Sequence, residues 1–385
     1  MKILYHHRTR SKDGQSVHIQ EMIAALRDLG HDVILVAPAG DSNQHFGSDD
    51  QNVVFLKRHV PQFVYETLEL AYNLLAFRNL AKAIRLHQPD CIYERYNLFL
   101  FAGIWAKRLY HIPLLLEINS PVFEERQHYD GIALKKIARW AQSWVWNAAD
   151  QVLPVTGVMA DIVASYGVPR DRISIIHNGI NTRGFHKLQA TASIRAALGL
   201  TNRLVLGFTG FVRQWHGLDK VIDMLASDPP DSRRHLLVVG DGPERLNLEH
   251  RARLHNIQHR VSFTGMVERE KIPDYVAIFD IALQPAVVAY ASPLKLIEYL
   301  ASGKAIVAPA QPNMCELLCN EHNALLFDPA QPDSMANAID RLCQDRQLLE
   351  HLSQNALKTI EDRQLTWAAN ARQVANLIER LIQHA

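Results

Sequence analysis

Short apolar runs rich in β-branched residues alternate with longer amphipathic stretches along almost the whole chain. Most of the runs are continuous rather than alternating, which is typical of strands buried on both faces. We therefore predict parallel sheets covered by helices on both sides. The predicted strands are Lys2–His6, Asp32–Ala37, Val53–Leu56, Cys91–Glu94, Pro113–Ile118, Gln151–Pro154, Ile173–Ile176, Leu204–Thr209, His235–Val239, Val261–Phe263, Ile281–Gln284, Ala305–Ala308 and Ala324–Phe327.

Helical patterns lie between many of these strands. One open sheet rarely holds so many strands, so the sequence favours two doubly wound α/β domains in its 385 residues. The break is expected near Asn178–His186, where a strand gives way to a polar stretch. The predicted helices are Val17–Leu29, Tyr65–His87, Ile132–Ala149, Leu218–Ala226, Glu244–His255, Leu294–Ala301 and, at the end of the chain, Trp367–His384.

Net charge and the lack of targeting segments exclude several classes of protein. The 41 basic and 40 acidic residues give a formal net charge of +1, which argues against nucleic-acid binding through bulk charge. The apolar run at the N-terminus is too short for a signal peptide, and no stretch approaches the ~20 apolar residues of a transmembrane helix. The 4 cysteines lack C-x-x-C spacing. These features predict a cytoplasmic protein.

The strongest candidate site is the segment Ala291–Gly303. Ser292 is a plausible N-cap, Pro293 suits the first helical position, and Gly303 would end the helix. The helix start would present the amides of Leu294–Leu296 with the Lys295 ammonium, a typical phosphate site. Glu298, one turn on, could accept both hydroxyl protons of a ribose. A well-capped helix with a surface Lys–Glu pair explains the same residues. Judged on this segment alone, that interpretation is favoured over a phosphate and ribose site.

Three other strand-to-helix loops are weaker candidates. Arg213 could contact phosphate in the basic loop after Leu204–Thr209, although a solvated arginine is the simpler interpretation. The loop Gly240–Glu244 lacks the third glycine of a dinucleotide fingerprint, which favours a plain helix start. Gly14 could let backbone approach a ligand after the first strand. The sequence shows neither H-E-x-x-H nor G-x-S-x-G, so it predicts no metal site and no serine hydrolase.

Taken in order, these loops resemble the retaining glycosyltransferases of family 4, which have the GT-B fold. The resemblance covers nearly the whole chain and is densest in the second half. It is carried by Gly210–Arg213, Val238–Glu244, Val261–Gly265 and Ser292–Tyr299, and Asn178–Ile180 resembles the interdomain junction.

The resemblance implies two Rossmann-like domains facing across a cleft. Residues 1–183 would bind the acceptor, residues 184–366 the nucleotide sugar, and the helix in 367–385 would return to the first domain. In the donor site, Arg213 would contact the diphosphate and Glu298 the ribose. The backbone at Met266–Val267 would face the base, and Gly14 would lie under the diphosphate. Ser292, Lys295 and the amides of Leu294 and Leu296 would complete the site.

Three positions depart from the family pattern. Tyr290 stands eight residues before Glu298, where the family often has a glutamate that contacts the donor sugar. His216 stands near the position of a usual lysine; we expect phosphate to favour its protonated form, so that donor binding weakens as the pH rises. A solvated loop residue beside Trp215, with Arg213 alone on the phosphate, explains His216 equally well. Asn119 stands where many members have a histidine on the acceptor side, and we count it with Arg213 and Lys295 as a catalytic candidate.

The sequence thus predicts a retaining, metal-independent hexosyltransferase of cell-surface polysaccharide synthesis, similar to bacterial enzymes. Its co-substrate would be a UDP- or GDP-type sugar and its acceptor a glycan or a lipid-linked glycan, with no other cofactor and no nucleic acid. Basic residues and tryptophans in Ala133–Trp146 predict contact with the inner face of the membrane; packing of the tryptophans on the sheet explains them equally well. Two alternatives remain open: a sugar-nucleotide epimerase on the same fold, and a non-catalytic nucleotide-sugar-binding partner of another transferase.

Overall fold

The computed structural model describes residues 1–9, 14–38, 59–182 and 191–383. Its contacts divide the chain into two compact units. Unit 1 comprises Met1–Asn178, Tyr290–Ser292 and Trp367–Ala385, and unit 2 comprises Gly179–Ala289 and Pro293–Thr366. The boundary predicted between residues 183 and 184 and the strand predicted over Val53–Leu56 lie outside the described residues.

Unit 1 is built on a five-stranded parallel sheet with strand order β2-β1-β3-β4-β5. Its strands are β1 (Lys2–His6), β2 (Asp32–Val36), β3 (Cys91–Arg95), β4 (Leu114–Ile118) and β5 (Gln151–Pro154). Its helices are α1 (Gly14–Asp28), α3 (Gln62–His87), α4 (Ala102–Tyr110), α5 (Val122–Glu125), the π-helical turn η1 (Arg126–Asp130), α6 (Lys135–Ala148), α7 (Gly157–Ser165), the 3₁₀ turn η2 (Arg170–Arg172) and α16 (Trp367–Gln383).

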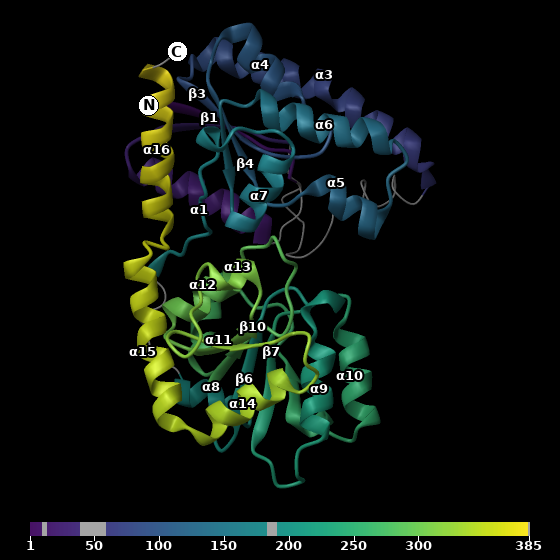
Figure 1. The fold of residues 1–385 in the computed structure, drawn as a ribbon, viewed down its shortest axis with the longest axis vertical. Coiled ribbons are helices and arrows are strands. Elements are labelled where there is room, and N and C mark those ends of the chain that lie inside the picture. Colours follow the sequence, from purple (N-terminus) through teal and green to yellow (C-terminus); the bar gives the residue numbers. More distant parts are fainter. Residues whose placement is uncertain (10–13, 39–58, 183–190, 384–385) are drawn as a thin grey trace. The chain divides into compact units, whose positions relative to one another are not determined.

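The terminal helix α16 packs on α1 within unit 1, and Figure 1 shows it in yellow beside the purple α1. Its buried face includes Trp367, Ala371, Val374 and Ile378, spaced at three or four residues as an amphipathic helix requires. The last helix is therefore part of the core of the first unit.

Unit 2 is built on a six-stranded parallel sheet with strand order β11-β10-β9-β6-β7-β8. Its strands are β6 (Leu204–Thr209), β7 (Arg234–Val239), β8 (Val261–Phe263), β9 (Ile281–Leu283), β10 (Ala305–Pro309) and β11 (Leu325–Phe327). Its helices are α8 (Thr191–Ala197), η4 (Gln214–His216), α9 (Leu218–Ala226), α10 (Arg245–Leu254), η5 (Gln258–Arg260), η6 (Arg269–Lys271), α11 (Ile272–Ala277), α12 (Leu294–Ala301), α13 (Pro312–Cys315), α14 (Ser334–Gln344) and α15 (Arg346–Asp362).

The sheet of unit 2 is buried on both faces, which explains its continuous apolar strands. In β7, Leu236 and Val238 join one hydrophobic cluster, while Leu237 and Val239 join a second cluster. Successive strand residues point to opposite faces, so both clusters need apolar side chains from the same strand.

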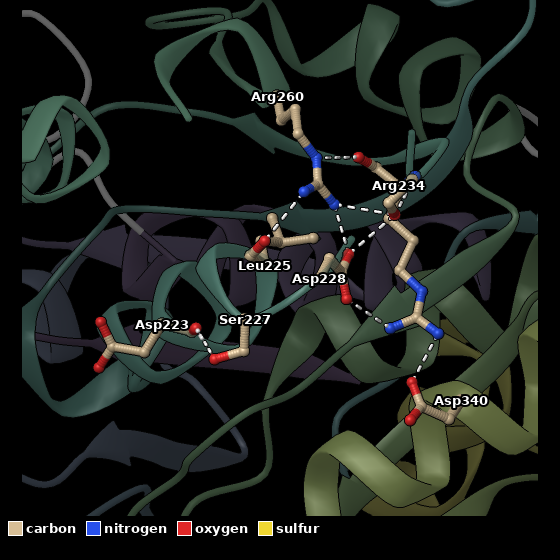
Figure 2. Close-up of polar contacts among 8 residues, drawn as sticks. Asp223, Leu225, Ser227, Asp228, Arg234, Arg260 and Asp340 are labelled. Carbon is tan, nitrogen blue, oxygen red and sulfur yellow. Dashed lines mark hydrogen bonds and ion pairs between the residues drawn. The ribbon is translucent and has the colours of Figure 1, made fainter. Parts of the chain in front are cut away.

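An ion network closes the end of this sheet where the strands begin (Figure 2). Arg260, only 3% exposed, ion-pairs with Asp228 and donates to the carbonyls of Leu225 (2.9 Å) and Arg234 (3.1 Å). The Arg234 side chain contacts Asp228 at 3.1 Å and Asp340 of α14 at 2.5 Å. The network therefore joins the entries to β7 and β8 with α14, at the sheet end opposite the loops considered below.

One predicted strand is wrong. Ile173–Ile176 forms only an isolated bridge between Ile173 and Val152. The amides of Ser174 and Ile176 donate to the carbonyls of Val152 and Pro154, both at 3.0 Å. The segment is therefore extended along the edge of β5, but its contact with the sheet is too sparse to form a ladder.

Candidate active site

Two glycine-containing loops meet where β6 and β7 end. The amide of Gly210 donates to the Val239 carbonyl at 3.0 Å, and that of Val212 to the Asp241 carbonyl at 2.8 Å. A Cβ atom on Gly240, whose φ is +140°, would lie 2.1 Å from the Gly210 oxygen. A Cβ atom on Gly242 would lie 2.2 Å from the Val212 oxygen. Close backbone packing therefore requires both glycines, beyond the plain helix start that the sequence favours.

Lys295 of α12 reaches over the first of these loops. A Cβ atom on Gly210 would lie 3.2 Å from its Cε, and its Nζ lies 3.9 Å from the centre of the Phe208 ring. The Nζ also lies 3.5 Å from Nε2 of His216, whose Nδ1 accepts the amide of Arg213 at 3.2 Å. The fold thus brings together three predicted phosphate-site residues, from the β6 loop and α12.

The Arg213 guanidinium lies over two aromatic rings. Its Cζ is 4.9 Å from the ring centre of Phe211 and 5.0 Å from that of Trp215, which is 43% exposed. Such stacking orients the planar cation and leaves its edges available for hydrogen bonds.

Burial and neighbouring positive charges determine the protonation states of Lys295 and His216. Burial lowers the pKa of Lys295 to about 7, although the nearby Glu298 carboxylate opposes the shift. Burial, and then the charges of Lys295 and Arg213, lower the pKa of His216 to about 2. In the protein without donor the His216 ring is therefore neutral, and its Nδ1 accepts a hydrogen bond. That bound phosphate favours the protonated ring stays a prediction. Lys295 is the group that titrates near neutral pH.

The start of α12 differs in part from the prediction. The residue before the helix is Pro293, and no side chain caps the end. Ser292 is therefore not the N-cap; its Oγ accepts the Asn178 amide at 3.5 Å and its carbonyl accepts Asn178 Nδ2 at 2.5 Å. The amide of Leu296 is not free either, since it donates to the Pro293 carbonyl at 3.1 Å. Of the predicted donors, Leu294 and Lys295 remain at the first turn.

A buried tyrosine fixes α12 to the sheet. The Tyr299 hydroxyl accepts the amide of Thr209, the last residue of β6, at 2.8 Å. Sequence reasoning missed this residue because its apolar neighbours suggest only core packing. The bond connects the end of β6 to the helix that carries Lys295 and Glu298.

The predicted ribose acceptor Glu298 is half-buried. Burial raises the pKa of its carboxyl, and the positive charges of Arg269 and Lys295 oppose that shift. Arg269, which the sequence analysis did not select, follows the loop after β8 that holds Val267. In that loop Met266 is 45% exposed, while Val267 packs against the core. The predicted base-facing backbone and ribose carboxylate thus lie in neighbouring elements of unit 2.

Gly14 and Asn119 belong to unit 1. Gly14 is the exposed first residue of α1, and its contact with the donor stays a prediction. Asn119 follows β4 and donates through Nδ2 to Oε1 of Glu117 at 2.5 Å.

Glu117 is the centre of a buried polar network that sequence reasoning missed. Its carboxylate ion-pairs with Arg95 and lies 3.1 Å from Nε2 of His18. It also accepts the hydroxyl of Tyr93 at 2.8 Å. Burial raises the pKa of Glu117, but His18 and Arg95 outweigh burial and hold it well below its usual range. The carboxylate stays charged and orients Asn119; four apolar neighbours in β4 concealed its role.

No cluster of three or more metal-ligating side chains occurs among the described residues. Within the same ranges, no helix is both long and apolar enough to cross a bilayer.

Comparison with known proteins places the chain in a family. Residues 12–183 match the family described as Glycosyltransferase Family 4, and residues 191–359 match Glycosyl transferases group 1. Over 376 residues the chain is 20% identical to a glycosyltransferase of Methanocaldococcus jannaschii, covering 94% of this chain and 93% of that protein. It is 24% identical to mannosylfructose-phosphate synthase of Agrobacterium fabrum, covering 95% and 86% of the two chains.

The fold is shared with solved GT-B glycosyltransferases. The crystal structure of Anabaena Alr3699/HepE, a complex with UDP, superposes with a TM-score of 0.79 at 20% identity, over 99% of this chain and 100% of that one. The predicted fold class, two Rossmann-like α/β domains, is confirmed. The structure has two units built on parallel sheets, and the two family matches cover both halves of the chain. The chain is therefore a glycosyltransferase of family 4, with the GT-B fold.

Proposed function

We propose that this enzyme transfers a hexose from a nucleotide diphosphate to an acceptor in cell-surface polysaccharide synthesis, with retention of configuration and without a metal. The observation that carries the proposal is the half-buried Lys295 amine, which lies over Gly210 and beside His216, in the loop that also carries Arg213. Half-buried cations on neighbouring elements suit a diphosphate, which can accept charge-assisted hydrogen bonds from both. The UDP complex of Alr3699/HepE, which has the same fold, supports a uridine-type donor.

Arg213 and Lys295 would also assist the transfer reaction itself. When the bond between the anomeric carbon and the phosphate oxygen breaks, negative charge grows on the leaving diphosphate. Arg213 and Lys295 stabilise that charge, as a metal does in other transferases. The acceptor oxygen bonds to the anomeric carbon on the face that the phosphate leaves, and a phosphate oxygen takes the acceptor's proton. This route retains configuration without a protein nucleophile.

A lipid-linked acceptor is supported by the exposed side of α6. Trp140 is 56% exposed and Ile137 43% exposed, and Lys136 and Arg139 are exposed beside them. Trp140 stacks on Trp144, with ring centres 6.0 Å apart. Trp146, in contrast, is completely buried. Aromatic and basic side chains on one exposed segment suit the interface of an anionic bilayer.

The test is a thermal-shift screen of UDP and GDP sugars, followed by transfer assays with and without acceptors. A bound donor raises the melting temperature by mass action. We expect a sugar-containing product only with acceptor, the donor's anomeric configuration in its NMR spectrum, and the same rate in EDTA. A changed donor without acceptor would indicate an epimerase, and donor binding without any turnover would indicate a non-catalytic partner.

A further inference from the structure

A second cluster of cations lies in unit 1, separate from the residues assigned to the donor. Its centre is Glu69 of α3, which is 4% exposed. Arg126 donates to the two oxygens of Glu69 at 2.6 and 2.8 Å, and Arg8 donates to one of them at 3.1 Å. Arg8 follows the end of β1, and Arg126 follows β4 and α5. Both cations therefore lie beyond the carboxyl ends of strands, where open α/β sheets bind ligands.

The cluster has more donors than its carboxylate can use. Two guanidiniums carry two positive charges, and Glu69 carries one negative charge. The next acid that acts on Arg126 is Asp130, an exposed residue whose charge water screens. The Arg8 Nη1 atom is buried, and it has no hydrogen-bond partner among the described residues. A buried charged donor without an acceptor is costly, so an anion that supplied the acceptor at this position would be stabilised.

The Arg8 side chain is held in place for such a contact. Its Cζ lies 5.1 Å from the ring centre of Tyr72, and Nη2 is fixed by Glu69. The side chains of Arg8 and Arg126 are 18% and 15% exposed, so part of each guanidinium side chain faces solvent, although the Arg8 Nη1 atom itself is covered. A planar guanidinium with one free edge matches the paired oxygens of a phosphate or a carboxylate.

We propose that Arg8 and Arg126 form a subsite for an acidic group on the acceptor, a phosphate or a carboxylate. The proposal rests on the proposed function, because it assumes that unit 1 binds the acceptor. It adds that the acceptor is anionic and names the residues that select it.

The test measures anion binding without donor or sugar transfer. The full-length variant Arg213→Gln/Lys295→Gln, which lacks the proposed donor phosphate site, is titrated calorimetrically with inorganic phosphate and, separately, with glucuronate. Adding Arg8→Gln should weaken binding of the preferred anion about tenfold or more, because a charge-assisted hydrogen bond is lost. The control is Arg170→Gln, which removes an arginine 66% exposed in a surface ion pair and should change nothing.

A variant with the opposite expected sign separates a ligand site from a structural cluster. Glu69→Gln removes the competing charge, so it should tighten binding of the same anion. Unchanged binding in Arg8→Gln, weaker binding in Glu69→Gln, or binding of neither anion by the parent would each overturn the subsite. Arg8→Gln leaves Arg126 paired with Glu69, so the test stands even if Arg126→Gln does not fold. The two proposals can fail separately. If the anion binds through Arg8 but the wild-type protein transfers no sugar in the assays above, the proposed function is refuted and the anion site remains.

Discussion

The side chains of Lys295 and His216 meet nitrogen to nitrogen, with Nζ 3.5 Å from Nε2. Because Nδ1 of His216 accepts the Arg213 amide, the proton of the neutral ring sits on Nε2. That N–H points toward Lys295, and only an uncharged amine can accept it. The contact therefore agrees with the lowered pKa of Lys295, about 7. A diphosphate oxygen between the two groups would accept from both and restore the ammonium.

Donor affinity should depend on pH through Lys295. The free protein has a Lys295 pKa of about 7, and a bound diphosphate raises it. Affinity should be constant below pH 7 and fall up to tenfold per pH unit above it, until the pKa of the complex is reached. Calorimetry in buffers of different ionisation enthalpy should show proton uptake on binding near pH 8. Lys295→Arg should flatten the profile; a wild-type profile that is flat from pH 6 to 9 would contradict the role.

Glu298→Ala should weaken donor binding and leave the fold intact. Loss of a charged acceptor for two hydroxyl groups costs roughly 1.5–3 kcal/mol, about 10- to 100-fold in affinity. The measurement is nucleotide affinity by calorimetry. Glu350→Ala, which removes one partner of an exposed ion pair with Arg346, is the matched control. Equal affinity in Glu298→Ala and wild type would exclude the ribose contact.

Arg213→Ala should lower kcat more than it raises KM, since the charge of the leaving group grows in the transition state. We expect a loss of roughly 10²–10³ in kcat, the usual effect of removing one stabilising donor. Arg213→Lys should rescue little, because an ammonium cannot stack on Phe211 and Trp215 as the planar guanidinium can. A change in KM alone would make Arg213 a binding residue only.

Arg260→Met should destabilise the protein without changing the residues of the proposed donor site. It leaves Asp228, whose side chain is 9% exposed, without its most buried partner. Breaking a buried pair from one side costs roughly 3–5 kcal/mol. The control is Arg251→Met: Arg251 and Asp223 are 43% and 41% exposed, and such pairs contribute roughly 0–1 kcal/mol. Urea unfolding should separate the two variants; equal losses would show that the network contributes little.

Trp140→Ala should weaken binding to anionic vesicles if α6 contacts the membrane. Flotation with vesicles containing phosphatidylglycerol should recover wild type, less of Trp140→Ala and still less of Lys136→Ala/Trp140→Ala. The control is Leu254→Ala, which removes a 68% exposed apolar side chain from unit 2. Absence of wild-type protein from the floated fraction would remove the membrane contact.

Local patterns predicted much of the fold. The predicted bounds are correct for four strands and two helices: β1, β5, β6, β8, α9 and α12. Hydrophobic periodicity and the residues that start or end an element depend only on positions close together in the sequence. The edge segment Ile173–Ile176 was wrong because a strand also needs a partner in register. Ser292 is not the N-cap because α12 begins at Leu294, which leaves Pro293 in that position. The Ser292 hydroxyl instead accepts the amide of Asn178, 114 residues away.

The sequence by itself determined the alternation of strand and helix, the glycine loops and the types of residue in the proposed donor site, since each depends on neighbouring positions. The tertiary structure alone decided how those residues act. It brings Lys295 against His216 across 79 positions and lowers both pKa values by burial. It also gathers Arg95, His18 and Asn119 around Glu117, and Arg8 and Arg126 around Glu69. Electrostatic energy depends on distance and burial in space, and a linear pattern records neither.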